Sequence, residues 1–106
     1  MIKINGKEYG LFYSVEAHIE IDDFIIANPA ASLTEGVVVR AIAMNRAYNK
    51  ANGIKDEVLK REDILTQPNG VFALLKAAVE EQEKKDSATS VQTEEKKTKN
   101  AKSASR

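Results

Sequence analysis

Nearly all the large apolar side chains of this 106-residue chain lie in its first 85 positions. From Asp86 to Arg106 the only one is Val91, and that segment is otherwise rich in Ser, Thr, Ala, Lys and Glu. Such a segment buries too little apolar surface to offset the entropy lost on ordering. The sequence therefore predicts one folded domain over residues 1–85 and a disordered, charged tail over residues 86–106.

The folded part begins with a hairpin pattern. Ile2 and Ile4 alternate with a lysine, and Asn5-Gly6 separates them from a second short run over residues 7–12. Asn-Gly between two short runs is the strongest local hairpin signal, because both central residues of a type I′ turn need a positive φ. We expect an antiparallel hairpin at the N-terminus.

Three helices are predicted next, over about residues 15–27, 33–51 and 68–85. Ser14 and Ser32 are placed to cap the first two, and Glu35 completes the pattern of a capping box. Pro68 suits the first turn of the last helix, which should fray near Lys85.

Residues 54–67 are ambiguous. Val58 and Leu59 fit either a short strand or a turn, and one or two helical turns are expected over residues 61–66. The predicted fold class is α+β, with an N-terminal β-hairpin packed on a bundle of about three helices.

The first helix has an unusually wide apolar arc on a helical wheel. Its polar face is narrow, and its apolar residues cover the rest: Ala17, Ile21, Phe24 and Ile25 opposite the polar face, then Val15, Ile19 and Ile26. An arc this wide predicts that the helix makes contacts on two sides.

Residues that carry chemistry are scarce. The chain has no cysteine, which excludes disulfides, thiolate catalysis and cysteine-ligated metal centres. His18 is the only histidine, with Asp22 one turn later, and this pair would orient a base or supply two metal ligands. No third ligand or nucleophile is signalled, so a structural role is favoured. We expect no enzymatic activity and no cofactor.

Nucleic-acid and membrane partners are disfavoured. Arg40, Arg46 and Lys50 would make a basic strip on the second helix, but the formal net charge is zero and a solvated face is the simpler interpretation. No apolar run approaches the roughly 18 residues needed to span a bilayer. The first residues lack the basic start and apolar stretch of a secretory signal, so a cytoplasmic protein is expected.

Four segments together resemble a known family. They are Lys3–Leu11, Ile21–Phe24, Ala41–Tyr48 and Arg61–Leu65. Over about residues 1–85 the chain resembles the tail assembly chaperones of long-tailed phages and prophages of Gram-positive bacteria. The resemblance implies a protein that coats the helical tape measure protein before the tail tube polymerises, is displaced by tube subunits, and is absent from the finished virion.

Under this interpretation, amphipathic helices bind the partner. The candidate contact residues are Ile21, Phe24, Ile25, Leu74 and Leu75, each of which fits a core position as well. The partners implied are the tape measure protein and, as an extension, the tail tube protein, together with self-association. Two alternatives stay open: another tail or head–tail structural or completion protein, and a small nucleic-acid-binding regulator.

Overall fold

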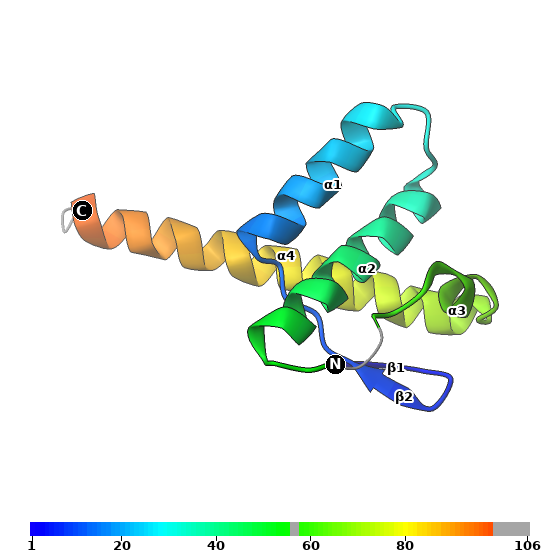
Figure 1. Cartoon of the computed structure of the whole chain (residues 1–106). Helices are drawn as coiled ribbons and strands as arrows, with labels where there is room; N and C mark the ends of the chain where they lie inside the picture. The colour runs from blue at the N-terminus through cyan, green and yellow to red at the C-terminus, as the bar shows by residue number, and fades with distance from the viewer. Residues whose placement is uncertain (56–57, 99–106) are drawn as a thin grey trace.

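A computed structural model describes the backbone of residues 1–55 and 58–98, and the side chains of residues 1–55 and 58–85. The elements in order are β1 (Ile2–Ile4), β2 (Lys7–Tyr9), α1 (Val15–Ala27), α2 (Leu33–Ala51), α3 (Arg61–Leu65) and α4 (Asn69–Thr98). Helix α2 is central, because α1, α3 and α4 all pack against it, while β1 packs on α4 (Figure 1). The predicted α+β fold, a hairpin packed on helices, is confirmed.

The hairpin forms as the Asn-Gly signal predicts. β1 and β2 pair antiparallel, with Ile2 opposite Tyr9 and Ile4 opposite Lys7. Asn5 and Gly6 have φ values of 54° and 81°, so both central residues of the turn are in the left-handed region. The pairing turns Ile2 and Ile4 into the core and leaves the side chain between them in solvent.

Both predicted serine caps are present. The Ser14 hydroxyl accepts a hydrogen bond from the Ala17 N–H at 3.1 Å, and the Ser32 hydroxyl accepts one from the Glu35 N–H at 3.0 Å. The other half of the predicted capping box is replaced. The Glu35 carboxylate accepts two hydrogen bonds from the Arg61 guanidinium, at 2.8 and 3.0 Å, and so joins α2 to α3.

The ambiguous region contains one short helix, α3, as expected, and no strand forms at Val58 and Leu59 among the described residues. Helix α4 differs from the prediction, because it continues to Thr98 instead of ending near Lys85. The charged run that suggested fraying places glutamates four residues before lysines, at Glu80–Lys84 and Glu81–Lys85, and this order supports a helix. The predicted disorder of residues 86–106 stays a prediction. The side chains of residues 86–98 and all atoms of residues 99–106 lie outside the described part of the chain.

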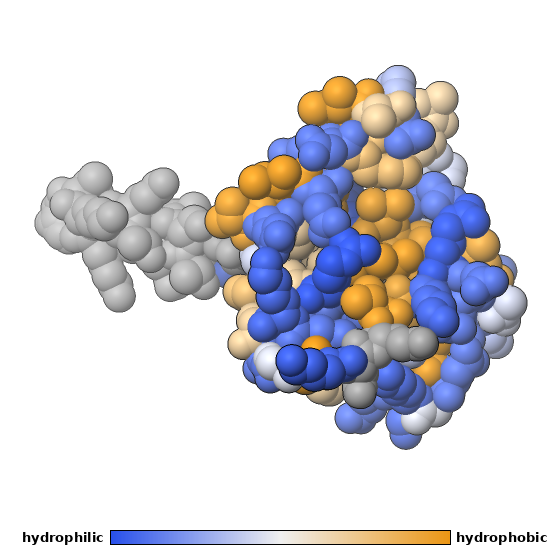
Figure 2. Space-filling view, in the orientation of Figure 1, coloured by the Kyte–Doolittle hydropathy of each residue, from blue (hydrophilic) through white to orange (hydrophobic). Residues whose placement is uncertain are grey.

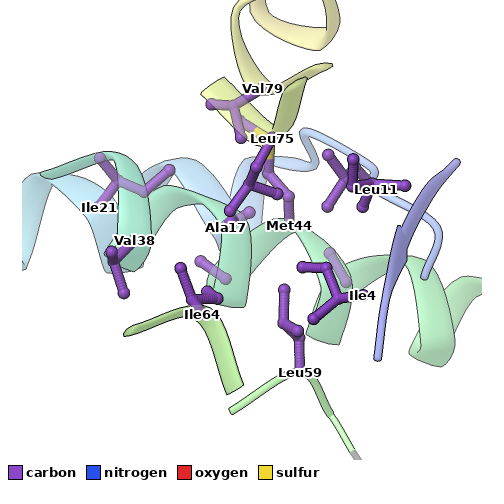
Figure 3. Close-up of a cluster of buried hydrophobic side chains, with 14 residues drawn as sticks. Ile4, Leu11, Ala17, Ile21, Val38, Met44, Leu59, Ile64, Leu75 and Val79 are labelled. Atoms are coloured by element: carbon purple, nitrogen blue, oxygen red, sulfur yellow. The ribbon is translucent and has the colours of Figure 1, made fainter. Parts of the chain in front are cut away.

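One cluster of buried side chains joins all the elements around α2 (Figure 3). The labelled members are Ile4, Leu11, Ala17, Ile21, Val38, Met44, Leu59, Ile64, Leu75 and Val79. Met44 of α2 is fully buried in this cluster. Eight residues of α2 are buried, so much of the surface of this helix packs inside the fold.

A buried amide fixes the connections around α2. Asn45 donates from Nδ2 to the Gly10 carbonyl oxygen at 2.9 Å and accepts at Oδ1 from the Leu59 N–H at 2.8 Å. Asn45 is 1% exposed. The amide therefore satisfies two backbone groups, one after the hairpin and one before α3, that have no strand or helix partner there.

Candidate protein-binding surface

The five apolar residues predicted to contact a partner fall into two groups. Ile21 and Leu75 lie in the core, 4% and 1% exposed, because their faces of α1 and α4 pack on α2. Neither can touch a partner in the folded chain, so both are removed from the candidate contacts. Phe24 is half-buried, whereas Ile25 and Leu74 are exposed.

Helix α1 exposes four large apolar side chains on the side away from the core. We define the α1 outer face as Val15, Ile19, Ile25 and Ile26, which are 78%, 56%, 48% and 78% exposed. At 100° per residue the first, second and last of these lie within about 40° of one another, opposite the buried Ala17 and Ile21. Figure 2 shows hydrophobic atoms along the outer side and the free end of α1. The helix is thus apolar on both its inner and outer sides.

Ion pairs mark the edge of α1 that lies along α2, whereas burial of Ala17 and Ile21 turns the inner side toward the core. Glu16 of α1 accepts from the Lys50 ammonium at 3.0 Å, and Glu20 pairs with the Arg46 guanidinium. Both partners belong to α2, the helix against which α1 mainly packs (Figure 1). The acidic edge therefore lies along α2, and the outer face is left without a neighbour in the part of the chain that the structure describes.

Two polar groups sit within the outer face. His18 and Asp22 are one turn apart, with 3.4 Å between Nε2 and Oδ2, and both side chains are more than half exposed. The Tyr13 ring stacks on the imidazole, with 5.2 Å between ring centroids and 24° between planes. The imidazole is therefore held between an aromatic ring and a carboxylate, which fixes its position on the surface.

No third His, Cys, Asp or Glu joins His18 and Asp22 to make a metal-binding group among the described residues. The structural role of His18 stays a prediction, and the contacts with Asp22 and Tyr13 are compatible with it.

The basic residues of α2 are neutralised by carboxylates of other helices. Arg40 lies 3.5 Å from the Glu83 carboxylate of α4, and Arg46 and Lys50 pair with α1 as described. These contacts tie three helices together. They leave no unpaired basic strip of these three residues for phosphate groups to bind.

A shallow apolar groove lies beside α2. Figure 2 shows it as hydrophobic atoms between two charged borders, and its apolar lining is Val39, Ile42, Ala43, Val58 and Leu59. Ala43 and Leu59 at its floor belong to the core cluster. The groove is therefore the outer surface of the core. The four residues of the α1 outer face, in contrast, are not part of the core cluster.

Within residues 1–55 and 58–98, no helix combines the length and the apolar character that a bilayer crossing needs. The other exposed large apolar residues are spread over the fold: Met1, Phe12, Leu33, Ile54, Leu65 and Leu74. Among the side chains that the structure describes, the α1 outer face is the largest grouping of exposed large apolar residues on one element.

Sequence analysis missed three residues of this surface as contacts, namely Val15, Ile19 and Ile26. The signal was present in the wide apolar arc of the first helix, but a wheel alone cannot say which part of an arc faces the core. The packing of α1 on α2, which buries Ala17 and Ile21, shows which part does. No family model, curated protein or solved structure matches the chain, so the surface is interpreted from its own residues.

Proposed function

We propose that this protein is a tail assembly chaperone of a long-tailed phage or prophage. It is a non-enzymatic protein of the host cytoplasm that binds the tape measure protein and is absent from the mature virion. The observation that carries the proposal is the α1 outer face, an apolar helix surface that nothing in the described chain covers. The resemblance of residues 1–85 to that family supplies the identity of the client.

The binding mode is helix against helix. An amphipathic client helix would lay its apolar stripe along the α1 outer face, parallel or antiparallel to α1. Helix α1 has 13 residues, so it is about 20 Å long. Half the lateral surface of such a helix, about 10 Å across, is on the order of 300 Å².

This area decides how strong one contact can be. At about 25 cal/mol per Å², covering on the order of 300 Å² on each partner yields about 15 kcal/mol at most. The freedom lost on association costs about 4 to 15 kcal/mol, so the net affinity of one copy is low. Several copies bound along one long client supply avidity, and tube subunits can displace the copies one at a time.

The first experiment measures whether the client stays soluble. A helical fragment of the tape measure protein from the same phage or prophage genome is co-produced with this protein, and its soluble fraction is measured. The native chain should raise that fraction, and the double variant Ile19→Lys/Ile26→Lys should not. The matched control is Leu33→Lys/Leu65→Lys, which makes the same charge change at exposed apolar residues elsewhere.

The control variant should protect the client as well as the native chain does. Equal protection by all three proteins would refute binding through the α1 outer face. A separate Leu74→Lys variant measures how much α4 contributes to client binding, because Leu74 is the candidate contact on that helix that remains exposed.

A structural component of the tail or of the head–tail junction is the main alternative. It would remain in purified particles, whereas a chaperone is released during assembly. Mass spectrometry of intact virions separates the two: the chaperone proposal predicts no peptides of this chain. The nucleic-acid regulator predicts binding that falls steeply with salt, and the ion pairing of the basic residues of α2 disfavours it.

A further inference from the structure

The polar residues of the α1 outer face are arranged so that the face complements a second copy of itself. Along α1 the order is Val15, then His18 with Ile19, then Asp22, then Ile25 with Ile26. Apolar residues therefore flank a basic-capable group and an acidic group that lie symmetrically about the middle of the helix, near residue 20.

A two-fold axis through that midpoint reverses the order. It brings Val15 of one copy opposite Ile25 and Ile26 of the other, and it brings His18 opposite Asp22. Because the operation is symmetric, the same contact is made twice. We propose that two copies of this chain pair through their α1 outer faces in an antiparallel, two-fold arrangement.

Charge complementarity is what favours a second copy over an arbitrary apolar partner. A purely apolar stripe covering this face would strip water from Asp22 and give it only its own His18 as a partner. In the two-fold pair each Asp22 carboxylate meets two imidazoles, and each imidazole meets two carboxylates. The stacking of Tyr13 on His18 holds the imidazole in place before the partner arrives.

The size of the face sets the strength of the pair. On the order of 300 Å² per copy is well below the roughly 800 Å² of a standard interface, so the dimer exchanges readily. The dimer covers the α1 outer face in the absence of client, and a client helix must displace the second copy to bind. This regulatory consequence rests on the proposed function, whereas the dimer itself does not.

Sedimentation equilibrium of the purified full chain, at concentrations up to about 500 µM, tests the pairing. The native chain should show a concentration-dependent dimer. Ile19→Lys/Ile26→Lys should weaken it by at least about tenfold, because four buried apolar contacts become charges. The control Leu33→Lys/Leu65→Lys should dimerise like the native chain. All four residues are exposed, so circular dichroism should show equal folding.

A charge exchange tests the antiparallel arrangement. His18→Glu should weaken the dimer, because it gathers four carboxylates at the centre of the interface. Adding Asp22→Lys should restore it, because each new glutamate then lies opposite a new lysine of the other copy. In a parallel pairing, like charges would face each other and the double variant would stay weak.

A native chain that stays monomeric, a dimer that survives Ile19→Lys/Ile26→Lys, or a double charge variant no stronger than His18→Glu would overturn the inference. These measurements contain no client, so their failure leaves the chaperone proposal standing. If the dimer forms as described but the tape measure fragment is not protected, the dimer inference stands and the chaperone proposal fails.

Discussion

Replacing the buried amide of Asn45 should destabilise the fold more than any other single polar substitution in α2. Asn45→Ala removes the acceptor of the Leu59 N–H and the donor to the Gly10 carbonyl, two contacts of 2.8 and 2.9 Å. Leaving a buried backbone group without a partner costs about 1–3 kcal/mol, so the two together cost about 2–6 kcal/mol. A domain of this size has a total stability of about 5–15 kcal/mol.

Urea unfolding followed by circular dichroism measures this loss, and thermal unfolding should show the midpoint falling by at least about 10 °C. Asn49→Ala is the matched control. Asn49 lies one turn further along the same face and is also buried, but its side chain makes no hydrogen bond among the described residues. It should cost less than about 1 kcal/mol. Equal losses in the two variants would refute the argument, because burial alone would then explain the effect.

Three further substitutions test the packing and the polar contacts of α2. The stability that Asn45→Asp loses relative to the native chain should be smallest in acid, because burial raises the folded-state pKa of the new carboxyl group above its unfolded value of about 3.9, and the loss should grow as the pH rises through the folded value. A Cβ added at Gly10 would overlap the Tyr48 ring, so Gly10→Ala should cost about 1–3 kcal/mol, and Tyr48→Ala should recover part of that cost in a double-mutant cycle. The hydrogen bonds from Arg61 lower the pKa of Glu35, so the stability that separates the native chain from Glu35→Gln should be present above about pH 4.3 and should shrink as the pH falls further. Urea titrations at several pH values check all three.

Local features of the fold could be predicted from the sequence. The Asn5-Gly6 turn and the Ser14 and Ser32 caps are confirmed, because each depends on residues no more than a few positions apart. The length of α4 is a local feature that the prediction missed. The alternating charges of residues 80–85 were interpreted as a solvated end, whereas their four-residue spacing supports helix.

Long-range contacts set the limit of the prediction. The two hydrogen bonds of the Asn45 side chain join it to residues 35 and 14 positions away in the sequence, and no local sequence pattern predicts either partner. The same is true of the candidate site. Ile19 and Ile21 belong to one apolar arc in the sequence, yet one is exposed and the other buried. Which of them is exposed depends on the side of α1 that packs on α2.

The proposal that matters most here is that the α1 outer face binds a client helix. Fluorescence anisotropy with a labelled, purified helical segment of the tape measure protein measures this directly. The account predicts saturable binding by the native chain and affinity lowered at least about tenfold by Ile19→Lys/Ile26→Lys. Unchanged affinity in that variant, or no binding by the native chain at all, would contradict it.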